Sequence, residues 1–513
     1  MSRASRVGAV LAAALLWLPA ATAQPVAAQT MTVAYPFGVG EAVPEPRARF
    51  NGAFTSRAGV TETLMGLDHD MQLFPWLAEG VAAVDDTTWR VTLREGLRFH
   101  DGAAVDAEAV VAAIEAVGQA DHPGHNPRLV ALLALEEVTA QDPRTVVFRT
   151  RAPDADFPHT LADPNLAIVG APSDAFPING TGPFVFREAV PNQLLRVEAS
   201  PGFRDGPPRL DALRFVAIPD AATASLAFEA GEVDIVTNVS EADFPRLAAR
   251  DDVQSHAEAT TRLFFLIPNT GSGPLADRRI RRAVSLGIDR EAIVAAALNG
   301  VGGVAAGTLF PAAMPWAADI PPAFDPDRAA ALLDEAGAAA QGGRRMWNGE
   351  PLTLSLWTYE GRAALRPTAE LVQAYLGQLG IAVTIRIAEY EANNDALRSG
   401  RADLTLQAWA TAPQGNPGYF PQTLLASDGG HNLSGWHHPE IDRLLAEGRR
   451  TFDTDARRDI YHEVQRIAVE EEAALIPLFH AAQLSVARAG VEGFRIHPSE
   501  VYLAHPGLGL ADR

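Results

Sequence analysis

The 513-residue chain contains no cysteine. Disulfide bonds, thiolate metal sites, iron–sulfur clusters and cysteine nucleophiles are therefore excluded. Lysine is absent as well, so all 42 basic residues are arginines, and neither a Schiff-base lysine nor a P-loop lysine is available. The 63 acidic residues outnumber these arginines and give a formal net charge of −21. That charge repels phosphate backbones and anionic membranes, so nucleic acid is not an expected partner.

Long hydrophobic runs are also missing beyond the start of the chain. Residues 7–18 form an apolar run that follows two arginines and ends before Pro19 and several small residues. This pattern is typical of a secretory signal peptide, and the run is shorter than the roughly 20 residues that span a bilayer. We expect residues 1–23 to be the signal peptide, with cleavage as late as residue 28. Without a cysteine the protein is not a lipoprotein, and we expect it to diffuse in a Gram-negative periplasm.

The remaining chain has the composition of a globular protein, with 47% hydrophobic residues. Its length predicts roughly two to four domains, and alternating strands and capped helices indicate an α/β fold. The clearest unit is a strand at 352–357, a helix from about 368 to Gly380, and a strand at 381–387. Further predicted elements are strands at 89–93, 263–267, 475–479 and 484–488, a helix capped by Asp106, and a helix from 455 to about 472.

Several segments together resemble one protein family. They are Glu62 to Glu79 with Trp89 to Val111, Gly180 to Phe184, Ile218 to Ile235, Asp277 to Arg290, and Ser434 to Leu445. In this order, and over nearly the whole chain after the leader, they resemble the extracytoplasmic solute-binding proteins of ABC importers. The resemblance is to family 5, the peptide/nickel-binding type, which includes dipeptide-, nickel- and opine-metallophore-binding proteins.

The resemblance implies an α/β, two-lobed periplasmic-binding-protein fold of class C, type II-like, with an extra subdomain in lobe one. By the family's layout, residues 24–66, 174–270 and 480–513 form the core of lobe one, residues 67–173 its outer subdomain, and residues 271–479 lobe two. A ligand that touches both lobes stabilises the closed form. The implied partners are a small solute and the permease subunits of an ABC transporter with their cytoplasmic ATPases. The implied protein is a monomer without a cofactor.

Family members line their crevice with residues around a tryptophan that ends a strand, which here is Trp409. Trp409, Tyr419 and Phe420 are therefore candidates to enclose a ligand, and plain packing at the hinge is the alternative. His431 and Asn432 lie in a turn-rich loop that the family places near the crevice. His431 is a candidate to bind an anion or, through a chelate, a metal; a solvated loop histidine is the alternative.

Arg57 is a candidate partner for a ligand carboxylate, and a surface ion pair is the alternative. Peptide-binding relatives usually carry an aspartate three residues after the tryptophan, where it pairs with the ligand's ammonium group. This chain has Ala412 there and lacks that charge-assisted bond.

Gly418 to Phe420 and the ending Ile496 to Tyr502 are more similar to the nickel/opine-type branch. The arginine that the nickel-binding branch carries in the segment matching residues 163–168 is not found here. We expect a metal chelate or an opine-like metallophore ahead of a di- or oligopeptide.

Two functional classes follow from these patterns. The first is a binding protein, not an enzyme, that delivers an unaltered small solute to an importer. The second is a secreted hydrolase whose catalytic residues are dispersed along the chain.

Overall fold

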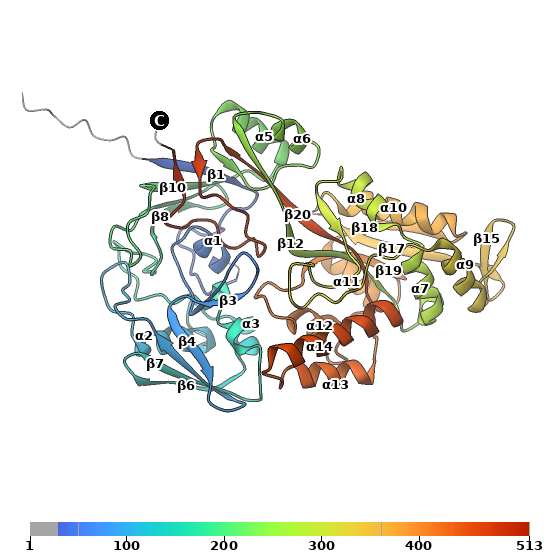
Figure 1. The fold of residues 1–513 in the computed structure, drawn as a ribbon, viewed down its shortest axis with the longest axis horizontal. Helices are drawn as coiled ribbons and strands as arrows, with labels where there is room; N and C mark the ends of the chain where they lie inside the picture. The colour runs from blue at the N-terminus through green and yellow to red at the C-terminus, as the bar shows by residue number, and fades with distance from the viewer. Residues whose placement is uncertain (1–28, 50, 361, 512–513) are drawn as a thin grey trace, which may run out of the picture.

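The computed structural model describes residues 29–49, 51–360 and 362–511. The predicted signal peptide and its cleavage site lie outside these residues. Figure 1 shows two halves, joined by long strands that cross between them. Within the described ranges, no helix combines the length and the apolar character needed to cross a membrane.

One sheet runs through both halves. It has eleven strands in the order β18-β17-β19-β12-β20-β11-β1-β10-β9-β8, and β13 pairs with β20 beside this path. Its central strands are β12 (Val253–Pro268) and β20 (Ile476–Arg488), which pair antiparallel and cross from one half to the other (Figure 1). Their register shifts between Ala259 and Leu263, and such an irregularity bends a sheet locally.

The first half is built around β1 (Thr30–Tyr35), which pairs in parallel with β10 and β11. Buried Met31 and Val33 of β1 enter a core that covers this part of the sheet. Its other elements are α1 (Asn51–Arg57), β8 (Phe184–Val190), β9 (Leu194–Ala199), β10 (Ala212–Ala217), α5 (Ala221–Ala230), β11 (Ile235–Val236) and α6 (Phe244–Ala248).

A separate antiparallel sheet, in the order β4-β5-β7-β6, forms the outer part of the first half. Buried Trp89, Val91 and Leu93 alternate with less buried residues, which confirms the predicted strand as β5 (Thr88–Leu93). Asp106 caps α2 as predicted, because its side chain accepts a hydrogen bond from the Ala109 N–H. The other elements are β2 (Met65–Leu67), β3 (Leu73–Pro75), β4 (Ala78–Ala83), α2 (Ala107–Gly118), α3 (Pro127–Leu133), β6 (Leu135–Asp142) and β7 (Thr145–Thr150).

The second half contains the predicted βαβ unit, which the structure confirms. β17 (Thr353–Tyr359) and β18 (Ala382–Ala388) pair in parallel, and α10 (Leu365–Gln378) connects them. The helix begins before the predicted start, because Pro367 lies in its first turn, where a proline removes no helical hydrogen bond. The other elements are α7 (Arg278–Leu286), α8 (Arg290–Ala297), β13 (Gly303–Ala305), α9 (Pro326–Glu335), β15 (Arg344–Trp347), α11 (Tyr390–Arg398), β19 (Leu404–Ala410), α12 (Tyr419–Leu424), α13 (Pro439–Gly448) and α14 (Thr454–Gln465).

The two crossing strands differ from the sequence-based prediction. The predicted strands at 475–479 and 484–488 are one continuous strand, β20, and the predicted strand at 263–267 is only the end of β12. Only the apolar parts were predicted, because hydrophobic patterns mark strands that are covered by a core. The linking residues 481–483 are only half-buried, since they lie between the two halves.

Candidate functional site

Charged side chains from four distant stretches of the chain meet where β12 passes between the halves. Arg57 ends α1, Arg262 lies in β12, Arg362 follows β17, and Glu500 lies near the carboxyl end. Arg262 Nη2 is 3.1 Å from Glu500 Oε2, and Arg57 Nη2 donates to the main-chain oxygen of Glu500 at 2.5 Å. We call Arg57, Arg262, Arg362 and Glu500 the arginine cluster.

The arginine cluster has an excess of positive charge, because three guanidinium groups surround one carboxylate. Burial acts to raise the pKa of Glu500, but Arg262, Arg362 and Arg57 together hold that pKa below its ordinary value. Partial loss of hydration beside the neighbouring protein atoms and the like charge of Arg262 lower the pKa of Arg362, although the side chain as a whole remains exposed. Arg362 is exposed, and the Glu500 side chain keeps 31% of its surface accessible. The cluster therefore offers positive charge to an anion between the halves.

Arg57 is held inside the arginine cluster by two contacts, and its predicted role as a partner for a ligand carboxylate stays a prediction. Its side chain is buried, and its guanidinium lies over the Tyr35 ring, 4.0 Å from the ring centroid. Together with the bond to the Glu500 main chain, this stacking fixes Arg57 as a rigid part of the cluster. Among the described residues, Arg57 takes part in no surface ion pair.

An aromatic row extends from the arginine cluster along the second half. Trp409 pairs with Leu263 across β19 and β12, so it lies one residue from Arg262. Its Nε1 donates to the Tyr390 hydroxyl at 3.0 Å, and the Tyr390 ring meets the Tyr359 ring edge to face at 5.0 Å. We call Tyr359, Tyr390, Trp409 and His431 the aromatic row.

His431 completes the aromatic row from the loop that the sequence predicted. Its ring lies 4.6 Å from the Trp409 ring, and its Nε2 is 3.4 Å from the Tyr390 hydroxyl. Burial lowers the pKa of His431, so the neutral imidazole is favoured near pH 7. Trp409 and His431 are both half-buried, so their rings together present a partly accessible aromatic surface.

The other three predicted residues have supporting positions. The Phe420 ring is fully buried, 5.3 Å from Phe265 and 6.4 Å from Trp409, so it supports Trp409 from the core. Asn432 donates to the main-chain oxygens of Ala426 and Trp436, at 3.0 and 2.7 Å, and holds its loop in shape. Tyr419 starts α12 near Arg128 and Asp163, where burial raises its pKa.

A second contact joins the halves on the side away from β12, where α13 and α14 meet the outer sheet (Figure 1). Arg457 of α14 forms an ion pair with Asp156, and the Ala155 N–H donates to the Arg449 oxygen at 2.8 Å. Burial and the neighbouring Asp156 raise the pKa of Asp154 to about 6. We call Asp154, Asp156, Arg449, Arg457 and Tyr461 the far-side contact.

Asp163 adds a polar link between the same two parts. Arg128 of α3 binds it with two hydrogen bonds, at 2.8 and 3.0 Å, and Gln414 of the second half donates to it at 2.8 Å. The Asn165 N–H donates to its Oδ1 at 3.0 Å. Each of the two Asp163 carboxylate oxygens therefore accepts two hydrogen bonds, which uses the accepting capacity of this carboxylate.

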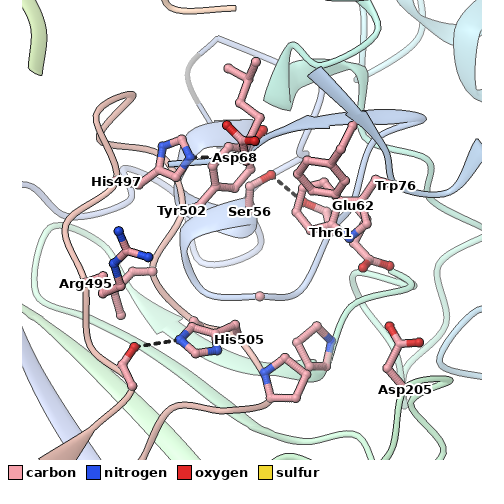
Figure 2. Close-up of a pocket in the computed structure, with 18 of the residues that line it drawn as sticks. Ser56, Thr61, Glu62, Asp68, Trp76, Asp205, Arg495, His497, Tyr502 and His505 are labelled. Carbon is pink, nitrogen blue, oxygen red and sulfur yellow. Dashed lines mark hydrogen bonds between the residues drawn. The ribbon is translucent and has the colours of Figure 1, made fainter. Parts of the chain in front are cut away.

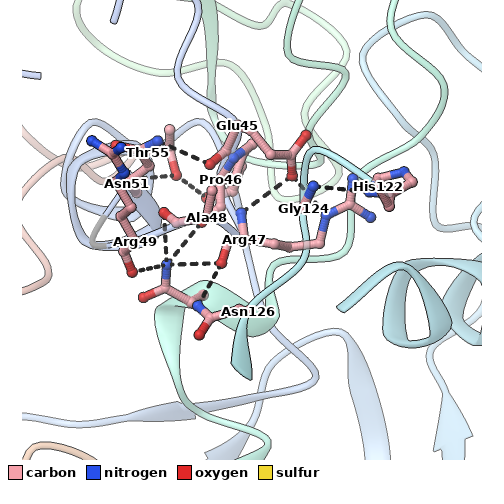
Figure 3. Close-up of polar contacts among 12 residues, drawn as sticks. Glu45, Pro46, Arg47, Ala48, Arg49, Asn51, Thr55, His122, Gly124 and Asn126 are labelled. Atoms are coloured by element: carbon pink, nitrogen blue, oxygen red, sulfur yellow. Dashed lines mark hydrogen bonds and ion pairs between the residues drawn. The ribbon is translucent and has the colours of Figure 1, made fainter. Parts of the chain in front are cut away.

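Amide side chains hold the loop that leads into α1. Asn126 donates to the Arg47 oxygen at 2.8 Å, and Asn165 donates to the Arg49 and Pro46 oxygens at 2.9 and 3.1 Å (Figure 3). Buried amides paired in this way fix backbone position. The loop therefore anchors the helix that carries Arg57.

Within residues 29–49, 51–360 and 362–511, no three histidine, aspartate or glutamate side chains are grouped so that they could hold a metal ion. Of the residues in the arginine cluster and the aromatic row, Trp409, His431 and Arg57 were predicted from the sequence. The residues that were not predicted are Arg262, Arg362, Tyr359, Tyr390 and Glu500. One feature of the sequence could have identified Arg262. Arg262 is a charge directly before the apolar run Leu263 to Ile267, and a charge in a central strand needs a reason.

Comparisons with known proteins are consistent across sequence and structure. Residues 72–432 match the family model described as bacterial extracellular solute-binding proteins, family 5 Middle. The chain is 29% identical to the probable di/tripeptide-binding protein 5 of Pseudomonas aeruginosa, over 95% of this chain and 97% of that protein.

Two solved structures are similar over nearly the whole chain. A nickel ABC transporter protein from Bacillus halodurans superposes with a TM-score of 0.82 at 28% identity, covering 94% of this chain and 100% of that one. NikA from Brucella suis in complex with Fe(III)-EDTA also gives a TM-score of 0.82, at 26% identity, covering 94% and 99%.

Proposed function

We propose a ligand class for this chain, which belongs to the bacterial extracellular solute-binding proteins of family 5. It is the substrate-binding protein of an ABC transporter of the peptide/nickel type, with a mixed α/β periplasmic-binding-protein fold. Members of this family bind solutes and are not enzymes, so the hydrolase alternative is not retained.

The proposed ligand is a small solute that carries carboxylate groups and binds at the arginine cluster. One observation carries this proposal: three guanidiniums lie around a single carboxylate, and three of these four side chains, those of Arg262, Arg362 and Glu500, keep accessible surface. Guanidinium groups pair with carboxylates through two parallel hydrogen bonds, which provides both energy and orientation. The aromatic row supplies an adjacent surface for the rest of the solute.

Within this class we favour a metal chelate or an opine-like metallophore. A bare divalent cation is repelled by the three guanidiniums, whereas a chelate with excess carboxylates is attracted by them. His431, with a neutral imidazole next to Trp409, is the proposed protein contact to a chelated metal. The Brucella suis relative was solved with Fe(III)-EDTA, which is a polycarboxylate chelate.

A di- or oligopeptide is the alternative, supported by the name of the Pseudomonas aeruginosa relative. Its carboxylate end suits the arginine cluster equally well. Its ammonium end needs a free carboxylate, however, and Asp163 already accepts from Arg128, Gln414 and the Asn165 N–H. Ala412 is fully buried and offers no charge.

The proposed mechanism is capture between two moving lobes. The predicted boundaries, with residues 24–66, 174–270 and 480–513 as the core of lobe one, 67–173 as its outer subdomain and 271–479 as lobe two, are retained as a proposal. Ligand bound at the arginine cluster favours the closed form, which the far-side contact also stabilises. We propose that a monomer then delivers the solute, in a Gram-negative periplasm, to permease subunits with cytoplasmic ATPases.

Calorimetric titration with Fe(III)-EDTA, Ni(II)-EDTA, nickel chloride and dialanine tests this proposal. We expect one-to-one binding of a chelate and none of nickel chloride. In the Arg362→Gln variant the affinity for the chelate should fall about 30-fold, as when one partner of a charged pair is removed at an interface. Arg362 is exposed, so this variant should fold normally.

Arg366→Gln is the matched control. Arg366 lies four residues further on, with 72% of its side chain exposed and an ion pair to Glu370, and its replacement should leave affinity unchanged. Binding of dialanine without any chelate would replace our ligand class with the peptide alternative. Equal effects of the two arginine variants would remove the arginine cluster from the ligand site.

A further inference from the structure

One cavity in the first half is lined by no residue of the arginine cluster or the aromatic row. Its volume is about 530 Å³, within the range of roughly 300–1,000 Å³ that is typical of small-molecule sites. Its walls come from the segment after α1, from β2 and β3, from the loop after β9 and from residues 493–506. No residue of 271–479 lines it, so it is separate from the space between the halves.

Four aromatic side chains and three histidines line the cavity. Trp76 lies between Phe74 and Tyr502, with ring centroids 5.8 and 5.3 Å away, and Tyr502 meets the His497 ring edge to face at 4.8 Å. Phe203, Pro183 and Pro506 complete the apolar lining. Figure 2 shows Trp76, Tyr502, His497 and His505 placed around the open centre. Such a wall favours a flat, apolar ligand.

The polar groups of the cavity carry a small negative excess. Glu62 is buried and accepts two hydrogen bonds from Arg204, both at 2.7 Å, so this pair is neutral overall. Of the other carboxylates and guanidiniums in the lining, Asp68, Asp205 and Arg495 are all exposed, and Arg204 Nε also lies 3.5 Å from Asp205 Oδ2. In total three carboxylates face two guanidiniums, which leaves an excess of one negative charge at the rim.

His497 adds no charge to this balance. Its Nε2 donates to the Leu67 oxygen at 3.0 Å, its Nδ1 accepts from Ser499, and burial lowers its pKa to about 4. The imidazole is therefore neutral at pH 7, and the excess in the cavity stays negative.

From this combination we infer that the cavity is a second binding site, which takes a small aromatic molecule without negative charge. The site is distinct from the arginine cluster in both position and charge, since one attracts anions and the other disfavours them. One segment separates the two sites: Glu500 faces the arginine cluster, while His497 and Tyr502 line the cavity.

Three probes with the same ring test this inference: indole, tryptamine and indole-3-acetate, which are neutral, cationic and anionic. Calorimetric titration of the full protein should give saturable one-to-one binding of indole and tryptamine. Indole-3-acetate should bind at least 10-fold more weakly than tryptamine. If none of the three binds up to its solubility limit, or if the anion binds as well as the others, the inference is wrong.

Two variants locate the binding within the cavity. Trp76→Leu should weaken indole about 10-fold, while Trp347→Leu, which alters a half-buried tryptophan in β15, should have no effect. Arg495→Glu changes an exposed side chain, so the variant should fold, and it should raise the preference for tryptamine over indole-3-acetate. An unchanged preference would place the probes elsewhere. Retained indole binding in Arg362→Gln separates this test from the test of the proposed function.

Discussion

The two places where the halves of the molecule meet use charge in opposite ways. In the arginine cluster, three guanidiniums share one carboxylate, and Arg362 and Glu500 keep accessible surface. In the far-side contact, Asp156 and Arg457 are buried and paired with each other. Unsatisfied charge with access to solvent is suited to a ligand, whereas buried and paired charge is suited to holding protein parts together.

The difference shows why the ligand site cannot be recognised from charge alone. The far-side contact has five ionisable groups, one more than the arginine cluster, and one of them is Asp154 with its raised pKa. Only the combination of excess charge and accessible surface distinguishes the two.

The largest effect should follow from breaking the far-side contact. Arg457→Gln leaves Asp156 buried without its ion-pair partner, so the free energy of unfolding should fall by about 3 kcal/mol. Urea unfolding measures this loss. Arg458→Gln is the control on the same helix, because Arg458 pairs with Asp455 while 38% of its side chain is exposed, and its loss should be small. Equal stability of the two variants would show that the contact does not hold the halves together.

Changing the aromatic row should affect binding and not folding. Trp409→Ala removes the ring that contacts His431 and Tyr390 in the aromatic row, so the affinity for the ligand should fall about 10-fold, in line with the loss of one stacked aromatic contact. The variant should remain folded, because Trp409 is only half-buried. Titration and thermal unfolding check the two parts of this prediction. An unchanged titration curve would count against a ligand at the aromatic row.

The raised pKa of Asp154 gives a stability effect with a defined sign. Burial and Asp156 favour the protonated carboxyl, so the folded protein binds this proton more tightly than the unfolded chain, whose pKa is 3.8. The resulting stabilisation is complete below about pH 4 and is lost as the pH rises through about 6.

Asp154→Asn cannot ionise and still accepts the Asp156 N–H, which Oδ1 accepts at 3.1 Å in the unaltered protein. This variant should therefore be more stable than the unaltered protein at pH 7.5, by on the order of 1 kcal/mol. At pH 4 the two proteins should be equally stable. Urea unfolding at both pH values measures the difference, and a constant difference would assign it to packing instead of ionisation.

The smallest effect should be the most informative about the ligand. Glu500→Gln removes the only carboxylate of the arginine cluster, so a carboxylate ligand should bind about 3-fold more tightly. A ligand whose ammonium group pairs with Glu500 should bind more weakly instead. Titration with Fe(III)-EDTA and with dialanine distinguishes the two cases by the direction of the change.

The sequence predicted the fold better than it predicted the site. Hydrophobic patterns reveal β5, α2 and the βαβ unit around α10, because each has a face that is covered by a core. The family resemblance adds the two-lobed arrangement. The centres of β12 and β20 carry no continuous hydrophobic pattern, since polar residues interrupt β12 and residues 481–483 of β20 are only half-buried, so the crossing strands were predicted only in part.

The site depends on contacts between distant parts of the chain. Arg57, Arg262, Arg362 and Glu500 are separated by up to 443 residues, and no local pattern marks residues that meet only after folding. For Phe420 a local sequence pattern was present, but it did not reveal how deeply the side chain is buried. Its position beside Trp409 in the family motif suggested a ligand contact, but its ring is fully buried against Phe265. Burial depends on the packing of α12 against β12, which spacing does not reveal.

Native mass spectrometry of the protein purified from the cells that naturally produce it tests most directly whether the arginine cluster binds the solute. We expect the protein to carry one small molecule, which is released chemically unaltered and bears carboxylate groups. The same molecule should be missing when the Arg362→Gln variant is purified in the same way. A cationic ligand without carboxylates, or one retained equally by Arg362→Gln, would contradict the claim that the arginine cluster binds the transported solute.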